Sequence, residues 1–207
     1  MEGAPPIEAE GLGKVWSGPL GSRRVEALAD FSLRVAPGSV HGLVGPNGSG
    51  KTTAIRCMLG LLRPTRGTAR LFGRPPAAAR AVGYAPERFD LAEKRTGRET
   101  LRLLGRLSGL EGRALDDAIA RELDRLALAA SADRPVGGYS KGMIRRLSIA
   151  AALLADPRLL VLDEPFDGLD PIGNQAVRDE VEARAAYGVA VLLSTHALAD
   201  LEAVATH

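Results

Sequence analysis

Residues 45–52 read Gly45-Pro46-Asn47-Gly48-Ser49-Gly50-Lys51-Thr52. This stretch matches the pattern G-x-x-x-x-G-K-[ST], whose glycines let successive backbone N–H groups turn inward and surround phosphate groups. We expect the Lys51 ammonium to reach the β- and γ-phosphates and the Thr52 hydroxyl to bind Mg²⁺. The sequence therefore predicts a loop that binds ATP with magnesium, and the next residue, Thr53, is assigned to the same site.

The residues on either side of this loop have the order that such a site requires. Residues 40–44 form a short apolar strand before it, and residues 52–62 are typical of a helix that ends before Pro64. The positive end of that helix adds to the attraction for anions. Strand, glycine loop and helix therefore follow one another as expected of a phosphate site.

The N-terminal third of the chain has the patterns of β-structure. Residues 7–16 and 25–35 are expected to be antiparallel strands joined by a Gly/Pro/Ser-rich loop at 17–22. Further strands are expected at residues 67–72 and 82–85. This part of the chain predicts an antiparallel β portion ahead of the main sheet.

Two aliphatic runs in the second half predict a parallel sheet. Residues 159–162 and 189–193 have the length and composition of strands that are buried on both faces. A helix at 171–187 connects them, and another at 141–155 precedes them and ends before Pro157. With few aromatic residues and many Ala and Leu, the chain favours an α/β fold with a mostly parallel sheet.

Between these parts the pattern becomes helical. Residues 98–107 and 114–128 carry apolar side chains at spacings of three and four, as amphipathic helices do. Their arginines alternate with Glu and Asp, which favours a solvated face over a surface for nucleic acid. We therefore expect a single domain, residues 1–207, with a core at 1–86 and 136–207 and an inserted α-helical subdomain at about 87–135.

Composition restricts the partners and the compartment. The formal net charge is +2, from 27 basic and 25 acidic residues, so there is no broad basic field and no nucleic acid is expected as a partner. The single cysteine, Cys57, cannot form an internal disulfide and is interpreted as a small core residue in a reducing cytoplasmic setting. No run of about 18 apolar residues appears, so we expect any work at a membrane to depend on docking to a partner.

Two carboxylates follow the aliphatic run at 159–162. Asp163 is placed at the C-terminal tip of a buried strand, where sheet enzymes position their ligands, and is expected to hold the magnesium shell. Glu164 suits a base that orients an attacking water. The alternative interpretation is an ordinary transition from strand to turn.

With these motifs in order, the chain resembles the nucleotide-binding subunits of ATP-binding-cassette (ABC) transporters, P-loop NTPases whose motifs span nearly the whole chain. Three further matches carry the resemblance: Tyr139-Ser140-Lys141-Gly142-Met143, Gly168-Leu169-Asp170 and Ser194-Thr195-His196. They correspond to the signature, the loop after the catalytic glutamate and the histidine switch of the family.

The resemblance implies roles for several residues. Ser140 and Gly142 would face the γ-phosphate held by a second subunit, although Ser140 also reads as a simple helix N-cap. His196 would hydrogen-bond the γ-phosphate, with an ordinary surface histidine as the alternative. Trp16 lies where the family has an aromatic residue that stacks on adenine, and a core tryptophan is its alternative.

The chain also departs from the family pattern. Glu87 stands where the family has a glutamine that contacts magnesium and the attacking water, so we expect metal coordination to survive with altered affinity or rate. Lys141 replaces a glycine and adds a cation beside the expected phosphate, and Met143 replaces a glutamine, as in exporters whose membrane subunits are separate chains. Only 11 residues follow His196, fewer than the family has, and a shortened chain is expected.

The resemblance predicts an ATP-hydrolysing subunit that powers transport through a separate membrane-spanning partner. Glu164, His196 and Lys51 would be its catalytic residues, and Thr52, Asp163 and Glu87 its magnesium ligands. It would pair with a second ATPase subunit, either a copy of itself or a similar chain, at the cytoplasmic face of the membrane as a peripheral protein. The alternative is a regulatory module whose output is ATP-dependent dimerisation. A DNA-repair ATPase ranks last, because it usually needs a long coiled coil before the signature.

Overall fold

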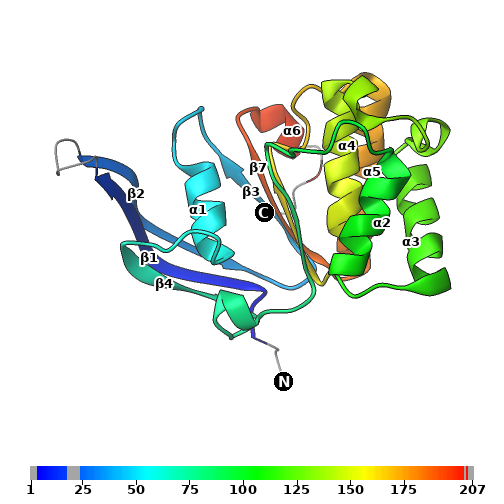
Figure 1. Cartoon of the computed structure of the whole chain (residues 1–207). Coiled ribbons are helices and arrows are strands. Elements are labelled where there is room, and N and C mark those ends of the chain that lie inside the picture. Colours follow the sequence, from blue (N-terminus) through cyan, green and yellow to red (C-terminus); the bar gives the residue numbers. More distant parts are fainter. Residues whose placement is uncertain (1–3, 18–23, 203, 205–207) are drawn as a thin grey trace.

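One helix, α1 (Lys51–Met58), lies between two β-sheets in the computed structural model of the chain (Figure 1). The structure describes residues 4–17, 24–202 and 204. The antiparallel sheet consists of β1 (Ile7–Ser17), β2 (Arg24–Val35) and β4 (Arg66–Leu71), in the order β2-β1-β4. The parallel sheet consists of β3 (Val40–Val44), β5 (Val82–Ala85), β6 (Leu159–Asp163) and β7 (Ala190–Thr195), in the order β3-β7-β6-β5. The predicted α/β fold with an antiparallel N-terminal portion is therefore confirmed.

Strand β6 separates two hydrophobic cores. Its residues alternate between the faces of the sheet, as the period of a strand requires. Leu159 and Val161 join the core that contains α1 and the antiparallel sheet, whereas Leu160 and Leu162 join the core on the opposite face. Every residue of β6 is buried, which confirms the expectation that this run is covered on both sides.

Helices cover the face of the parallel sheet opposite α1 (Figure 1). Two of them pack on the strands, α4 (Lys141–Leu153) and α5 (Pro171–Ala186), and two lie farther out, α2 (Gly97–Leu107) and α3 (Gly112–Arg125). The short elements are η2 (Pro76–Ala78), η3 (Ala129–Ser131), η4 (Val136–Gly138) and α6 (Leu198–Glu202). Thr96 and Glu99 start α2 with a capping box, in which each side chain accepts a hydrogen bond from the other residue's backbone N–H.

Some element ends differ from the predicted ones. Helix α1 ends at Met58 and not at residue 62, because Gly60 takes a left-handed conformation with φ of 70°. Helix α3 ends at Arg125 and not at residue 128, since Ala127 has φ of 51°. Strand β7 is longer than predicted and ends at Thr195. The predicted loop at 17–22 lies, beyond Ser17, outside the described residues.

A group of charges around the buried Arg184 joins the outer helix α3 to α5. Arg184 Nη2 donates to both carboxylate oxygens of Glu122 at 3.1 and 3.3 Å, and its Nη1 donates to Asp156 Oδ1 at 2.7 Å. Arg184 Nε completes the group with a hydrogen bond to Glu180 Oε1. Burial opposes the charge on Arg184, but these carboxylates raise the pKa of Arg184 on balance. The ion pairs thus hold α3 to α5, which packs on the sheet.

Replacing Arg184 with methionine is expected to lower the free energy of unfolding by about 3–5 kcal/mol, because Glu122 and Glu180 would remain buried without their shared cation. Urea denaturation of the purified chain measures the loss. Arg113→Met is the control, because the Arg113 side chain is 93% exposed and Arg113 Nε lies 3.6 Å from Asp117 Oδ2 on the surface of α3. Equal stabilities of the two variants would contradict the role given to Arg184.

Candidate nucleotide-binding site

The phosphate loop lies between the end of β3 and the start of α1 and borders a cavity of about 380 Å³. Gly50 has φ of 94°, and a Cβ atom built on it would lie 2.4 Å from the carbonyl oxygen of Ala27 in β2. Only glycine allows this close approach. The residues that line the cavity come from β2, the phosphate loop and two later segments: Ala27, Asn47, Gly48, Ser49, Gly50, Lys51, Thr52, Thr53, Glu87 and Glu164.

The Lys51 side chain folds back to the start of the phosphate loop. Its Nζ donates to the carbonyl oxygens of Gly45 at 2.5 Å and Pro46 at 3.3 Å. The same nitrogen lies 3.1 Å from Glu164 Oε1. Lys51 therefore connects the phosphate loop with the carboxylate that follows β6.

Asp163 and Glu164 are held by Ser194 of the neighbouring strand β7. The Ser194 hydroxyl donates to Asp163 Oδ1 at 2.6 Å and accepts a hydrogen bond from the Glu164 backbone N–H at 3.0 Å. Parallel pairing places Asp163 beside Ser194, so the two strands fix this contact. Glu164 itself has φ of 52°, in the left-handed region, which turns its side chain out of the strand direction.

These residues fit a magnesium ion. Asp163 is 1% exposed, and its Oδ2 atom has no hydrogen-bond partner among the described residues. No cluster of three or more His, Cys, Asp or Glu side chains forms a metal cage within residues 4–17, 24–202 and 204. Mg²⁺ is typically held by one or two protein carboxylates together with substrate phosphates and waters, so one free buried carboxylate oxygen suits it.

His196 completes the surroundings of Glu164. Its Nδ1 atom lies 2.9 Å from Glu164 Oε2, while Lys51 Nζ lies beside Oε1. The Glu164 side chain is nearly buried, and the His196 side chain is half exposed. Both oxygens of Glu164 thus have a nitrogen neighbour, which fixes the direction in which the carboxylate can accept a proton or orient a water.

The chain also resembles known proteins in the region that carries this site. Residues 28–167 match the family model described as ABC transporter. The chain belongs to the ABC transporter family. A solved structure of the ATP binding subunit of an ABC transporter is 32% identical, with a TM-score of 0.82, and the match covers 96% of this chain and 82% of that one. A dimeric ATP-binding cassette in a post-hydrolysis state, bound to ADP and Pi, is 20% identical with a TM-score of 0.84 and shares the fold.

Curated relatives include proteins with export and resistance in their names. Nod factor export ATP-binding protein I of Sinorhizobium fredii is 43% identical over 80% of this chain. The daunorubicin/doxorubicin resistance ATP-binding protein DrrA of Streptomyces peucetius is 40% identical over 96%, and an uncharacterized ABC transporter ATP-binding protein of Bacillus subtilis is 41% identical over 88%. The matches cover 50%, 60% and 61% of the lengths of these three relatives.

Within a single chain, the signature residues Ser140 and Gly142 lie outside the cavity beside the phosphate loop. Ser140 is the N-cap of α4, where its hydroxyl accepts a hydrogen bond from the Met143 backbone N–H at 3.2 Å, so the capping interpretation is confirmed. Gly142 packs against the loop after β6, because a Cβ atom on it would lie 2.8 Å from the Gly168 carbonyl oxygen. Neither residue lines the cavity around the phosphate loop. Their contact with a nucleotide remains a prediction.

Lys141 has a partner in its own chain. Its Nζ lies 2.7 Å from Asp167 Oδ2, in the loop that follows Glu164. The hydrogen bond from Lys141 lowers the pKa of the Asp167 carboxyl. The cation expected beside a phosphate is therefore paired with a carboxylate of the same cassette.

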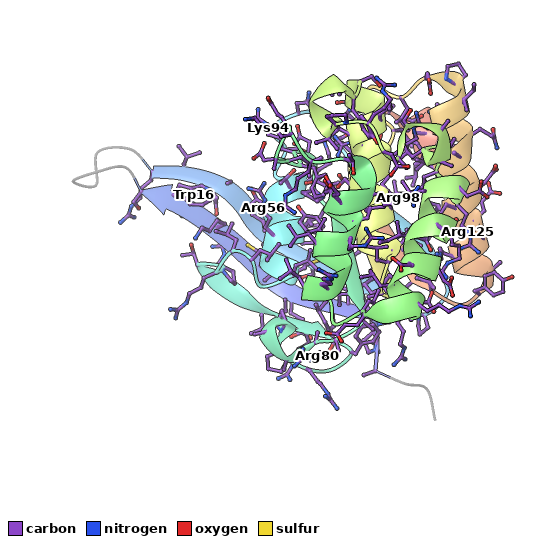
Figure 2. The ribbon with its side chains drawn as sticks, turned by 45° about the vertical axis from the view of Figure 1, so that its right-hand side comes forward. Trp16, Arg56, Arg80, Lys94, Arg98 and Arg125 are labelled. Carbon is purple, nitrogen blue, oxygen red and sulfur yellow. The ribbon has the colours of Figure 1, made fainter. Side chains whose placement is uncertain are left out.

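Trp16 is not a core residue, which rules out that alternative. It is 48% exposed on β1, and Figure 2 shows it on the antiparallel sheet. Lys14 Nζ lies 4.6 Å from the centre of its ring, a cation–π contact. Stacking on adenine remains a prediction, since Trp16 does not line the cavity beside the phosphate loop.

Sequence reasoning missed two contributors to the site. Ala27 lines the cavity from β2, and nothing in its sequence context marks it. Arg145 is 5% exposed, and its Nη1 donates to backbone carbonyls at both Pro86 and Asp163. The available signal was the pair Arg145 and Arg146, directly before the apolar second half of α4. Cys57 is buried, as expected for a small core residue.

Replacing Ser194 with alanine is expected to lower the free energy of unfolding by about 1–3 kcal/mol, because Asp163 Oδ1 and the Glu164 N–H would lose a shared buried partner. Urea denaturation measures the change. Ser148→Ala is the matched control: Ser148 is as deeply buried, but its hydroxyl has no hydrogen-bond partner within the described part of the chain. If both variants are equally stable, Ser194 does not anchor the two carboxylates.

The single tryptophan offers a direct test of adenine stacking. ATP and ADP, which share adenine, are expected to change the fluorescence of Trp16, whereas inorganic triphosphate leaves it unchanged. Trp16→Ala should weaken ATP binding about tenfold, since stacking of one base on an aromatic ring contributes roughly 1–3 kcal/mol. Tyr187→Ala, at an exposed aromatic residue after α5, serves as the control. An unchanged ATP affinity in Trp16→Ala would rule out stacking.

Proposed function

We propose that this cassette binds ATP with magnesium, hydrolyses it, and powers transport through a separate membrane-spanning partner. One observation carries the proposal: the Glu164 carboxylate borders the cavity of the phosphate loop and is held between Lys51 and His196. Family membership and the 32% identical ATP binding subunit support the same function. ATP is the substrate, and the residues around the cavity would bind its phosphates.

Binding would use the backbone N–H groups of the loop 45–52 and the Lys51 ammonium for the phosphates. The Thr52 hydroxyl, the free Asp163 oxygen and the Glu87 carboxylate would hold Mg²⁺, which neutralises charge on the β- and γ-phosphates when bound. The N-terminal end of α1 adds a positive dipole.

Hydrolysis would follow from the position of Glu164. A water molecule that donates a hydrogen bond to Glu164 attacks the γ-phosphorus, and the bond from this phosphorus to the bridging oxygen breaks. The products are ADP and inorganic phosphate, and the proton of the water is taken up by the carboxylate or the phosphate. Lys51 offsets developing negative charge, and His196 keeps Glu164 in one orientation and hydrogen-bonds the γ-phosphate.

A second copy of the chain would complete the site. Ser140 and Gly142 start a helix whose free N–H groups suit a phosphate, and neither contributes to the cavity of its own chain. We infer that they face the γ-phosphate held by the other copy, in a head-to-tail pair with two ATP molecules. The dimeric cassette with the same fold is compatible with this arrangement.

The membrane partner would be a separate chain, with the cassette docked as a peripheral protein at the cytoplasmic face. No helix among the described residues is long and apolar enough to cross a membrane. The names of two relatives refer to Nod factor export and to daunorubicin/doxorubicin resistance, which favours an exporter. Residues about 87–135, with α2 and α3, would act as a helical subdomain between the core segments 1–86 and 136–207.

Replacing Glu164 with glutamine is expected to reduce ATP turnover by about 10²–10⁴-fold, because an amide cannot take up the proton of the attacking water. ATP binding should persist, since the phosphate loop is unchanged. Phosphate release and equilibrium ATP binding measure the two effects. Glu182→Gln, at an exposed position of α5, should retain wild-type turnover. Full hydrolysis by Glu164→Gln would refute the assignment of Glu164.

A further inference from the structure

Arg145 is a buried cation in the helix that begins at the signature. It lies in α4, which packs on strands β5 and β6 of the parallel sheet. Only 5% of the residue is exposed, so its guanidinium is largely removed from water. A buried charge of this kind needs partners, because desolvation opposes it.

Two loops of the candidate site provide those partners. Arg145 Nη1 donates to the Pro86 carbonyl oxygen at 2.8 Å, directly before Glu87. The same nitrogen donates to the Asp163 carbonyl oxygen at 3.2 Å, in the peptide unit that leads into Glu164. A single guanidinium nitrogen thus holds the backbone directly before Glu87 and directly before Glu164, and both of these carboxylates line the cavity.

The hydrogen bond to the Asp163 carbonyl lies directly before a residue with a strained backbone. Glu164 has φ of 52°, which L-residues adopt rarely and which needs support from its surroundings. Ser194 supports this turn from β7, through the Glu164 N–H, and Arg145 supports it from α4, through the preceding carbonyl. The direction of the Glu164 side chain therefore depends on contacts from both sides.

The charge of Arg145 also acts on the site. Burial lowers the pKa of Arg145, whereas the carboxylates of Asp167, Glu87, Asp163 and Glu164 raise it. A guanidinium remains charged at neutral pH. Glu87 and Glu164 line the cavity where a triphosphate would bind. The hydrogen bonds to the Pro86 and Asp163 carbonyls place the Arg145 cation one residue from each of these carboxylates, where it offsets part of their negative charge.

We propose that Arg145 is a positioning residue that fixes the Glu87 and Glu164 loops and offsets the negative charge of Glu87. The inference rests on the proposed function, because it concerns the same ATP site. Arg145 does not line the cavity, so it acts through the two carboxylates and not on the nucleotide directly.

Arg146 is the matched control for a purely structural role. It is 6% exposed, and its Nη1 donates to the carbonyl oxygens of Leu126 and Ala127, both at 2.9 Å. The two neighbouring arginines are thus equally buried, and each donates to two carbonyls. Arg146, however, binds the backbone at the end of α3, away from Glu87 and Glu164.

The test compares Arg145→Gln, Arg145→Lys and Arg146→Gln, each with and without Glu87→Gln. Urea denaturation first shows which variants are folded, and equilibrium Mg²⁺-ATP binding and turnover are then measured. Arg145→Gln should raise the Kd for ATP about tenfold, as loss of one nearby compensating charge predicts. It should also lower kcat about tenfold to a hundredfold, as loss of a charged hydrogen bond predicts.

Adding Glu87→Gln to Arg145→Gln should return the Kd to within about threefold of wild type, because it removes the uncompensated carboxylate. Such non-additive effects of two substitutions are expected only between interacting residues. Arg145→Lys should keep the affinity and lose part of kcat, since it retains the charge but not the planar donor. Arg146→Gln should lose stability alone.

Two results would overturn the proposal: affinity and kcat within twofold of wild type in Arg145→Gln, or an affinity loss that Glu87→Gln does not reverse. Different results would refute the proposed function. A wild-type chain that binds Mg²⁺-ATP without turnover refutes hydrolysis, while the Kd comparison still decides the role of Arg145. A wild-type chain that binds no nucleotide refutes both.

Discussion

The parallel pairing of β6 with β7 is the constraint on which the site depends. It sets Asp163 opposite Ser194, and one hydroxyl then holds the side chain of Asp163 and the backbone of Glu164. A shift of one residue in this register would turn these side chains to the other face of the sheet. The same pairing brings β7 to its end at Thr195, so that the next residue, His196, lies beside Glu164.

Burial on both faces protects this register. Strands β6 and β7 are buried along their whole length, with α1 on one side and α4 and α5 on the other. Any sliding of the two strands would expose aliphatic side chains to water or force them into a packed core, and both are unfavourable. The hydrophobic cores thus stabilise the geometry of a polar site that lies at the strand ends.

The sequence was informative where a residue type has one dominant reason to occur. The glycines and lysine of residues 45–52, and the aliphatic run 159–162 followed by two carboxylates, predicted the phosphate loop and the strand that ends beside it. It was uninformative where the outcome depends on tertiary contacts. The exposure of Trp16 and the carbonyls that Arg145 binds both depend on segments distant in sequence. No local pattern encodes these contacts.

Gly50 has a mechanical consequence. A Cβ atom at this position would lie 2.4 Å from the Ala27 carbonyl oxygen, so the phosphate loop rests directly on the backbone of β2 with no side chain between them. Backbone in such contact has no compressible layer to absorb displacement. A displacement of β2 towards this loop would therefore meet the loop backbone itself, and no side chain between the two could rearrange to absorb it.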